Sequence, residues 1–169
     1  ENKSLHKKIN LRYGENPHQK SHLLKLKPNK NLIDNIIQGK ELSYNNLRDA
    51  NVALNCVNEF KEPTCVIVKH CSPCGVSLGN NIYSAFNKAI KTDPISSFGG
   101  IIAINKKLDI KTAKLISKNF YEILLAPSFD LKALKILSLK KNLRIIKSLG
   151  IKTKNKNEVI SLNDDLLVQ

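Results

Sequence analysis

Aromatic side chains are scarce in this sequence: they make up 5% of its 169 residues, and tryptophan is absent. Proteins that bind nucleic acids usually show a recognised motif, stacking aromatics or basic residues gathered on one face. Here the lysines are scattered from Lys3 to Lys156, and no such motif occurs. The scarcity of aromatic residues, the scattered lysines and the missing motif argue against a dedicated nucleic-acid-binding module, and we do not expect nucleic acid as a partner.

Acidic residues are few as well, 14 against 28 Lys and Arg, which leaves a formal net charge of +14. Such a charge draws a protein toward polyanions through Coulomb attraction and counterion release. A basic nucleic-acid-binding module therefore remains an alternative function for the chain. The interpretation we favour is a solvated basic surface that arises from AT-rich codon usage and has no polyanionic partner.

Long apolar runs are missing too: no stretch is long enough to cross a membrane, and we find no signal peptide. The four cysteines, Cys56, Cys65, Cys71 and Cys74, are expected to stay reduced. Cys71 and Cys74 have the spacing of a zinc half-site or a redox pair, but a structural zinc site needs a second pair of ligands and only His70 is near. We expect a cytoplasmic protein with no membrane contact and no bound metal.

What the sequence does contain is enough apolar residues, 41%, for one domain with a substantial core. Residues 1–22 form a polar, turn-rich opening segment, and residues 23–169 form the domain. There, helical spacing of apolar residues alternates with short β-branched runs, which predicts the α/β class: three layers, with helices on the faces of a mainly parallel sheet. The predicted helices span 46–60 (begun by Asn46 and Asp49) and 81–91 and follow Asp109 and about Ser128; the predicted strands span 64–68, 101–104, 121–126, 143–146 and 166–169.

Lys69 and His70 leave the first of these buried strands side by side, where small polar residues would be usual. In α/β sheets the chemistry belongs to loops at the carboxyl ends of strands, and we expect both this segment and residues 93–100 there. A neighbouring ammonium disfavours a charged imidazole, so His70 would stay neutral and able to accept a proton. The pair suits base catalysis beside an anionic substrate. The alternative is that both side chains simply end the strand and point to solvent.

Two other segments carry candidate binding groups. The run Ser-Ser-Phe-Gly-Gly at 96–100 could present hydroxyl and N–H groups to an anion, although a glycine pair before a strand is equally common in plain turns. In residues 11–19, Arg12 could hold a phosphate through a forked contact and Tyr13 could lie against a heterocycle. The alternative for residues 11–19 is a solvated arm.

Four motifs in this order resemble a known family. They are Leu-Arg-Tyr-Gly-Glu-Asn-Pro-His-Gln at 11–19, Gly-Lys-Glu-Leu-Ser-Tyr-Asn-Asn at 39–46 followed by Asp49, Lys-His-Cys-Ser-Pro-Cys-Gly at 69–75, and Thr-Asp-Pro at 92–94 leading to Ser-Phe-Gly-Gly at 97–100. Together they are similar to the first half of the transformylase domain in the bifunctional purine biosynthesis enzymes, which combine aminoimidazole carboxamide ribonucleotide (AICAR) transformylase with IMP cyclohydrolase. The resemblance runs from about residue 9 to the last residue.

The resemblance implies formyl transfer from the co-substrate 10-formyltetrahydrofolate to the exocyclic amine of AICAR, on the pathway to IMP, by a cytidine deaminase-like fold. His70 would be the general base or proton shuttle, and Lys69 would stabilise the transition state. Deaminases bind zinc through Pro-Cys-x-x-Cys, but here Pro73-Cys74 is followed by Ser77, so no catalytic zinc is expected. The residues that would bind substrate are Arg12, Tyr13, Asn16, His18, Asn45, Asp93, Ser97, Phe98 and Gly99.

The sequence departs from the resemblance at Asp164-Asp165, where relatives carry a glycine pair close to the nucleotide. Two carboxylates would repel a phosphate, and this motivates a third hypothesis, a decayed relic without catalysis. The chain opens at Glu1 without Met and closes on an interrupted strand, so we expect a fragment that lacks the second half of the transformylase domain and the cyclohydrolase domain and is inactive alone. The resemblance also implies a homodimer for the full-length parent.

Overall fold

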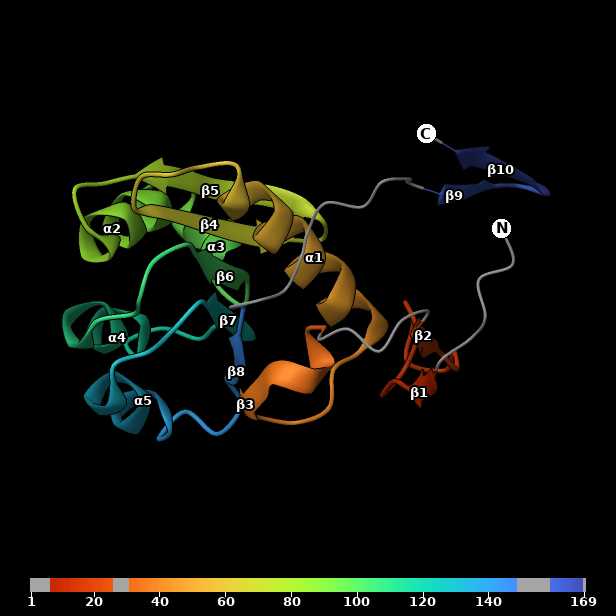
Figure 1. The fold of residues 1–169 in the computed structure, drawn as a ribbon, viewed down its shortest axis with the longest axis horizontal. Helices are drawn as coiled ribbons and strands as arrows, with labels where there is room; N and C mark the ends of the chain where they lie inside the picture. Colours follow the sequence, from red (N-terminus) through yellow and green to blue (C-terminus); the bar gives the residue numbers. More distant parts are fainter. Residues whose placement is uncertain (1–6, 26–30, 149–158, 169) are drawn as a thin grey trace.

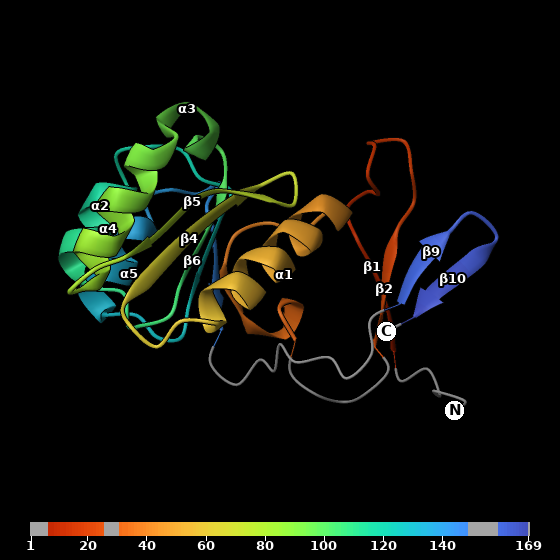
Figure 2. The ribbon, with the colours of Figure 1, turned by 90° about the horizontal axis from the view of Figure 1, so that it is seen from above.

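A six-stranded sheet lies between two layers of helices, as Figures 1 and 2 show. The computed structural model describes residues 7–25, 31–148 and 159–168. In chain order the elements are β1 (Lys7–Asn10), β2 (His22–Lys25), the 3-10 helix η1 (Ile33–Asn35), β3 (Ile36–Gln38), α1 (Tyr44–Asn58), β4 (Thr64–Lys69), β5 (Ser72–Leu78), α2 (Ile82–Thr92), α3 (Pro94–Ser97), β6 (Ile101–Ile104), α4 (Ile110–Ile116), β7 (Ile123–Ala126), α5 (Leu131–Leu137), β8 (Arg144–Lys147), β9 (Val159–Leu162) and β10 (Asp165–Val168).

Side chains of the sheet alternate between its two faces, and helices cover each face. Val66, Val68 and Leu125 pack against α1, whereas Ile67 and Leu124 pack on the opposite face with α2, α4 and α5. All five side chains are fully buried, and burying one such side chain contributes about 1.5–3 kcal/mol. Figure 2 shows α1 on one side of the sheet and the other long helices on the opposite side. The predicted three-layer α/β architecture is confirmed.

The sheet is mixed, however, which corrects the expectation of a mainly parallel one. Its order is β3-β8-β7-β6-β4-β5: β6, β7 and β8 run parallel, but β4 is antiparallel to both β5 and β6, and β3 is antiparallel to β8. The turn between β4 and β5 holds only His70 and Cys71, and so short a connection joins only antiparallel strands. Pro73 and Gly75 predict a loop after β4, yet this stretch forms the edge strand β5, where proline is tolerated.

The helices begin where a side chain caps their free N–H groups. α4 starts directly after Asp109, as predicted. α1 starts at Tyr44, earlier than the predicted 46, because Ser43 and not Asn46 is its N-cap: the Ser43 hydroxyl accepts from the Asn46 backbone N–H, and the Asn46 side chain accepts from the Ser43 N–H. Asp49 therefore lies beyond the capped turn, and its carboxylate is used elsewhere. The strands predicted from β-branched runs are observed as β4, β6, β7 and β8.

Two antiparallel hairpins, β1–β2 and β9–β10, lie outside the central sheet (Figure 1). The first hairpin contains residues on both sides of residue 22, where the sequence suggests the boundary of the opening segment. In the second, Asn163 adopts a φ of 52° beside Asp164, and the strand predicted at 166–169 is observed as β10. Asp164 and Asp165 are both exposed at this turn.

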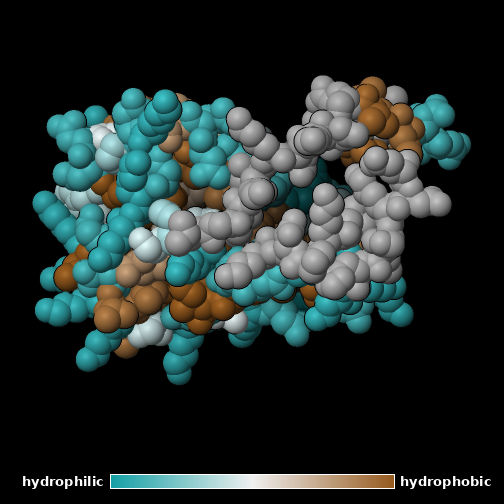
Figure 3. Space-filling view, in the orientation of Figure 1, coloured by the Kyte–Doolittle hydropathy of each residue, from teal (hydrophilic) through white to brown (hydrophobic). Residues whose placement is uncertain are grey.

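Hydrophilic side chains cover most of the face seen in Figure 3, and apolar ones gather in separate patches, among them one toward its lower edge and one at its upper right. Among the described residues, Ile95, Leu131 and Leu139 are the most exposed large apolar side chains, at 86%, 83% and 82%. Single exposed apolar residues of this kind are ordinary on soluble proteins. The surface in Figure 3 is therefore mainly a solvated one.

Candidate functional site

The segments singled out in the sequence meet at one end of the sheet, where β4 finishes and β6, β7 and β8 begin. The expected position at a carboxyl end is correct for Lys69, the last residue of β4, and for His70, which follows it. It is wrong for residues 93–100, which precede β6. The two segments are nevertheless neighbours because β4 and β6 are antiparallel and Val68 pairs with Ile101. The reversed direction of β4 thus brings a strand end and three strand beginnings together.

The turn between β4 and β5 has an unusual backbone. His70 and Cys71 both adopt positive φ angles, 52° and 58°, as the two central residues of a type I′ turn do. Asn and Gly normally fill such turns, and another residue in the left-handed region costs on the order of 1–2 kcal/mol. Asp49 of α1 supports the turn: its carboxylate accepts hydrogen bonds from the backbone N–H of His70 at 3.2 Å and of Cys71 at 2.7 Å. Strained backbone held by its surroundings is typical of functional sites.

The turn presents Lys69 and His70 in different ways. Lys69 is half-buried, and its Nζ donates to the carbonyl of Phe98 at 2.9 Å. Because an ammonium has three donors, two remain for a ligand. His70 is exposed, and within the described part of the chain no hydrogen bond holds its imidazole. Both groups can therefore reach a ligand in front of the sheet edge.

Residues 93–100 fold around Asp93. Its carboxylate caps α3 by accepting from the Ser96 backbone N–H at 2.9 Å, and hydrogen bonding to Ser96 holds the pKa of Asp93 below its ordinary value. Ser97 is buried, and its hydroxyl donates to the carbonyl of Pro94 at 3.0 Å. Asp93 and Ser97 thus shape this segment through these hydrogen bonds, and the substrate contacts predicted for them stay predictions.

Phe98 and Gly99 close the segment beside the start of β7. Phe98 is 57% exposed, and its ring lies tilted against that of Phe120, with centroids 5.6 Å apart. Gly99 has a φ of +74°, where any side chain would be strained, and its N–H donates to the carbonyl of Phe120 at 2.9 Å. The backbone carbonyl that holds the Lys69 ammonium therefore belongs to a residue of an exposed aromatic pair.

The opening segment reaches the same edge through Arg12 and Tyr13. The Arg12 N–H donates to the carbonyl of Leu42, and the Tyr44 N–H donates to the carbonyl of Tyr13. The Arg12 guanidinium lies 4.6 Å from the Tyr13 ring centroid and donates to its hydroxyl at 2.9 Å. These two side chains line a pocket of about 200 Å³, the cationic pocket, together with Lys40, Phe120, Glu122, Asn142 and Arg144. Three cations and one carboxylate make it suited to a phosphate.

Asn16, His18 and Asn45 are not among the residues that line the cationic pocket in the described structure. The Asn45 side chain donates to the carbonyl of Glu15 at 2.9 Å and so ties the opening segment to α1. The Asn16 backbone N–H donates to the Gln19 side chain at 2.8 Å, and His18 lies exposed in the same turn. These contacts shape the turn, and the substrate contacts expected for the three residues stay predictions.

Glu122 and Arg144 belong to this edge, although sequence patterns do not single them out. Glu122 Oε2 accepts from the Asn46 side chain at 2.7 Å and lies 3.8 Å from Arg144 Nη1, while Arg144 Nε donates to the Lys40 carbonyl at 3.2 Å. Arg144 is only 7% exposed; burial lowers its pKa from the ordinary value, and Glu122 opposes that shift. The signal in the sequence is slight: an arginine directly before two isoleucines in a short strand.

The whole chain, residues 1–169, matches the family described as AICARFT/IMPCHase bienzyme. The chain belongs to this family. It is 51% identical over 168 residues to the bifunctional purine biosynthesis protein PurH of Clostridium kluyveri, a match that covers 98% of this chain. The PurH proteins of Halalkalibacterium halodurans and Caldicellulosiruptor saccharolyticus are each 49% identical, over 172 and 165 residues, which covers 98% and 94% of this chain.

Membership of the AICARFT/IMPCHase family confirms the resemblance inferred from the four motifs. The chain spans about a third of the length of the curated relatives it matches, with 34%, 33% and 32% of the three PurH proteins covered.

The two thiols of the C-x-x-C pair, Cys71 and Cys74, have different hydrogen-bond partners in this AICARFT/IMPCHase member. The Cys71 thiol donates to Asp49 Oδ1 at 3.3 Å, whereas the Cys74 thiol donates to the Ile67 carbonyl at 3.5 Å. All four cysteines are free. Across residues 7–25, 31–148 and 159–168, no group of three or more His, Cys, Asp or Glu side chains could hold a metal ion, and no helix is long and apolar enough to cross a membrane.

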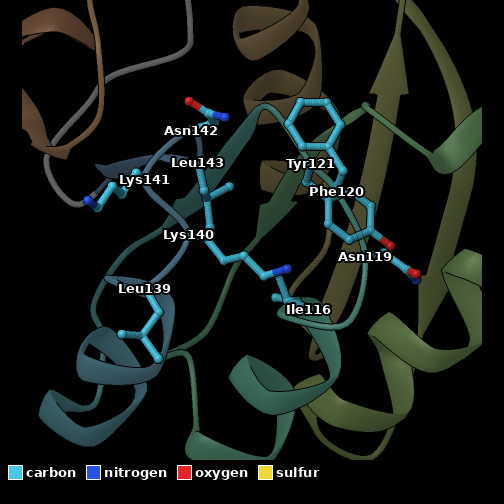
Figure 4. Close-up of a pocket in the computed structure, with 9 residues that line it drawn as sticks. All are labelled: Ile116, Asn119, Phe120, Tyr121, Leu139, Lys140, Lys141, Asn142 and Leu143. Atoms are coloured by element: carbon cyan, nitrogen blue, oxygen red, sulfur yellow. The ribbon is translucent and has the colours of Figure 1, made fainter.

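A second pocket, of about 350 Å³, lies beside the cationic pocket and shares Phe120 and Asn142 with it (Figure 4). It is formed by the end of α4, the start of β7 and the chain between α5 and β8. In Figure 4 the Lys140 side chain extends across it toward Ile116. None of the site residues predicted from the sequence lines this second pocket, and we assign it no part in the proposed chemistry.

Proposed function

We propose that this chain carries the AICAR-binding and proton-transfer groups for formyl transfer from 10-formyltetrahydrofolate to AICAR. One observation carries the proposal: in a member of the AICARFT/IMPCHase family, the Lys69–His70 turn and the cationic pocket lie at the same sheet edge. The aromatic pair joins them, since Lys69 contacts the backbone of Phe98 and the ring of Phe98 packs on Phe120, which lines the pocket.

Arg12, Lys40 and Arg144 would hold the nucleotide's phosphate. Arginine forks match phosphate oxygens. Arg144 is buried, which strengthens its ion contacts relative to bulk water, whereas Arg12 and Lys40 are exposed. Tyr13 and Phe120 supply flat apolar surface for the ribose and the heterocycle. The remaining predicted contacts, from Asn16, His18, Asn45, Asp93, Ser97, Phe98 and Gly99, would shape the surrounding loops or meet the base.

The reaction needs help because the AICAR amine has its lone pair delocalised into the ring and is a poor nucleophile. In the proposed step the amine nitrogen bonds to the formyl carbon, His70 accepts the amine proton, and the bond from the formyl carbon to the folate nitrogen breaks as that nitrogen takes up a proton. The Lys69 ammonium stabilises the charge that develops on the formyl oxygen. We expect no metal to take part.

The proposal extends to the longer proteins of this family. By analogy with the PurH relatives, a protein of their length would combine this formyl transfer with the IMP cyclohydrolase activity that the family name states. Its remaining two thirds would supply the second half of the transformylase domain, and it would act as a homodimer. Free thiols at all four cysteines suit a reducing cytoplasm, where purine synthesis would take place.

Thermal unfolding with and without AICAR tests the binding proposal. A ligand at about 100 times its Kd stabilises a folded chain by about 2.7 kcal/mol, which raises the Tm of a chain this long by about 5–10 °C. Arg12→Ala should remove most of the rise, whereas Lys132→Ala, which deletes one exposed cation on α5, should keep it. An equal rise in both variants would exclude Arg12 from the binding site and contradict the proposed pocket. No rise in a folded chain would contradict binding itself and favour the relic hypothesis.

The proton-transfer proposal is tested in a chimera in which this chain replaces the matching 168 residues of the Clostridium kluyveri relative. His70→Ala should lower the rate of formyl transfer by about 10²–10⁴-fold, because a positioned base contributes that much. The Tm rise with AICAR should survive the substitution. A His70→Ala chimera that is as active as its parent would exclude His70 from the chemistry.

A further inference from the structure

Asp49 connects α1 to the His70–Cys71 turn through both oxygens of its carboxylate. Oδ2 accepts from the His70 N–H, and Oδ1 accepts from both the N–H and the thiol of Cys71. The two turn residues have positive φ angles but are neither glycine nor asparagine. This backbone is uncommon for both, and more so for Cys71 than for His70. The turn therefore depends on support from outside the hairpin, and Asp49 provides it.

The helix that carries Asp49 is itself fixed to the sheet. One turn earlier, Asn46 closes the capping box with Ser43 and donates from its side chain to Glu122 at the start of β7. Ala50, next to Asp49, is fully buried against the sheet. Because capping, a cross-element hydrogen bond and core packing all hold α1, the carboxylate of Asp49 has one position relative to β4.

We propose that Asp49 is a positioning residue for formyl transfer. It holds the turn in its left-handed backbone conformation and so sets the directions in which the His70 imidazole and the Lys69 ammonium point. It is not a catalytic residue, since its half-buried carboxylate is occupied by three donors of the turn. This inference rests on the proposed roles of Lys69 and His70.

The test separates an effect on the turn from an effect on the whole fold. In the chimera, Asp49→Ala should lower kcat by about 100-fold, the loss that a misplacement of about 1 Å produces, with little change in the KM for AICAR. Asn51→Ala, an exposed position on the same helix, should leave both constants unchanged. Asp49→Asn keeps one acceptor oxygen, so its kcat should lie between those of the parent and of Asp49→Ala. If the alanine variant fails to fold, the asparagine variant replaces it in this test.

Rescue decides the mechanism. Glycine adopts a positive φ without cost, so Cys71→Gly in the Asp49→Ala background should restore kcat to within about tenfold of the parent. The ³J coupling between the amide and α protons of His70, measured on the isotope-labelled chain, should move in Asp49→Ala and return in the double variant. An unchanged kcat or coupling in Asp49→Ala, or a loss that Cys71→Gly does not repair, overturns the inference.

A different result is expected if the proposed function, and not the role of Asp49, is wrong. In that case the His70→Ala chimera is as active as its parent, whatever Asp49→Ala does. If His70→Ala is inactive while Asp49→Ala keeps full activity, formyl transfer through His70 stands and the positioning role of Asp49 falls.

Discussion

The Nζ of Lys69 lies 2.9 Å from the carbonyl oxygen of Phe98, a hydrogen bond between residues 29 positions apart in the chain. It ties the end of β4 to the segment that precedes β6. The partner of this ammonium is a neutral carbonyl and not a carboxylate, so the contact fixes the position of Lys69 without cancelling its charge. That arrangement suits a cation whose task is to meet negative charge on a ligand.

Replacing Lys69 should therefore affect activity far more than stability. Lys69→Ala in the chimera should lower formyl transfer by about 10²-fold or more, because a positioned donor to the developing oxyanion is lost. The free energy of unfolding should fall by about 1 kcal/mol at most, the usual worth of one partly exposed hydrogen bond. Steady-state rates and urea unfolding measure the two effects. A stability loss of several kcal/mol would mean that Lys69 is chiefly structural.

Glu122→Ala, unlike Lys69→Ala, should lower the free energy of unfolding. Arg144, 7% exposed, would lose its counter-charge, and the Asn46 side chain would lose its acceptor. Breaking a fully buried pair costs about 3–5 kcal/mol, but here the Glu122 side chain is 41% exposed and the ions are 3.8 Å apart, so we expect about 2 kcal/mol. Urea unfolding measures it, with Glu59→Ala as a charge-matched control on the exposed end of α1. Equal effects of the two substitutions would refute the role of Glu122.

The thiol of Cys71 reports on Asp49. Burial raises the pKa of Cys71, and the hydrogen bond and negative charge of Asp49 raise it further. Asp49→Asn removes the charge, so the pKa should fall, and the curve of alkylation rate against pH should move to lower pH because more thiolate is present at each pH. Iodoacetamide labelling followed by peptide mass spectrometry separates Cys71 from Cys74, whose rate should not change. A curve that stays in place or moves upward would contradict the prediction.

Gly75→Ala tests the packing of β5 on α2. A methyl group at this position would lie 2.4 Å from the backbone carbonyl oxygen of Ala89, which cannot move without bending the helix. We expect a loss of about 1–3 kcal/mol in the free energy of unfolding, the usual cost of overpacking. Val76→Ala, at an exposed neighbouring position of the same strand, should cost clearly less. Similar losses at the two positions would show that β5 is not packed as described.

Local patterns predicted the elements of this fold better than their arrangement. Runs such as Ile101–Ile104 identify a buried strand, but they carry no information about its direction. The reversal of β4 depends on the His70–Cys71 turn, whose left-handed backbone neither residue favours by itself. The helix–turn contact of Asp49 could not be predicted either, because it joins residues that only the packing of α1 on the sheet brings together.

The candidate site shows the same limit. Lys69, His70, Arg12 and Tyr13 could be picked out because each stands in a dense motif of polar and turn-forming residues. Glu122 directly precedes the apolar strand β7, and Arg144 is the first residue of β8, before two isoleucines. Their pairing follows from the adjacency of β7 and β8 in the sheet. A parallel pair of this kind is set by strand order, which short-range periodicity does not contain.

The reversal of β4 also decides how an anion can be held at this edge. α4 and α5 follow β6 and β7, so their capped N-termini at Asp109 and Asp130 lie at the far end of the sheet, and the positive ends of their macrodipoles face away from the cationic pocket. The first turn of α1 does lie near, but the N–H groups of Tyr44 and Asn46 are already taken by the carbonyl of Tyr13 and the hydroxyl of Ser43. Side-chain cations would therefore have to do what helix dipoles do in many nucleotide-binding sheets, and the proposed anion binding would depend on individual residues and on salt concentration.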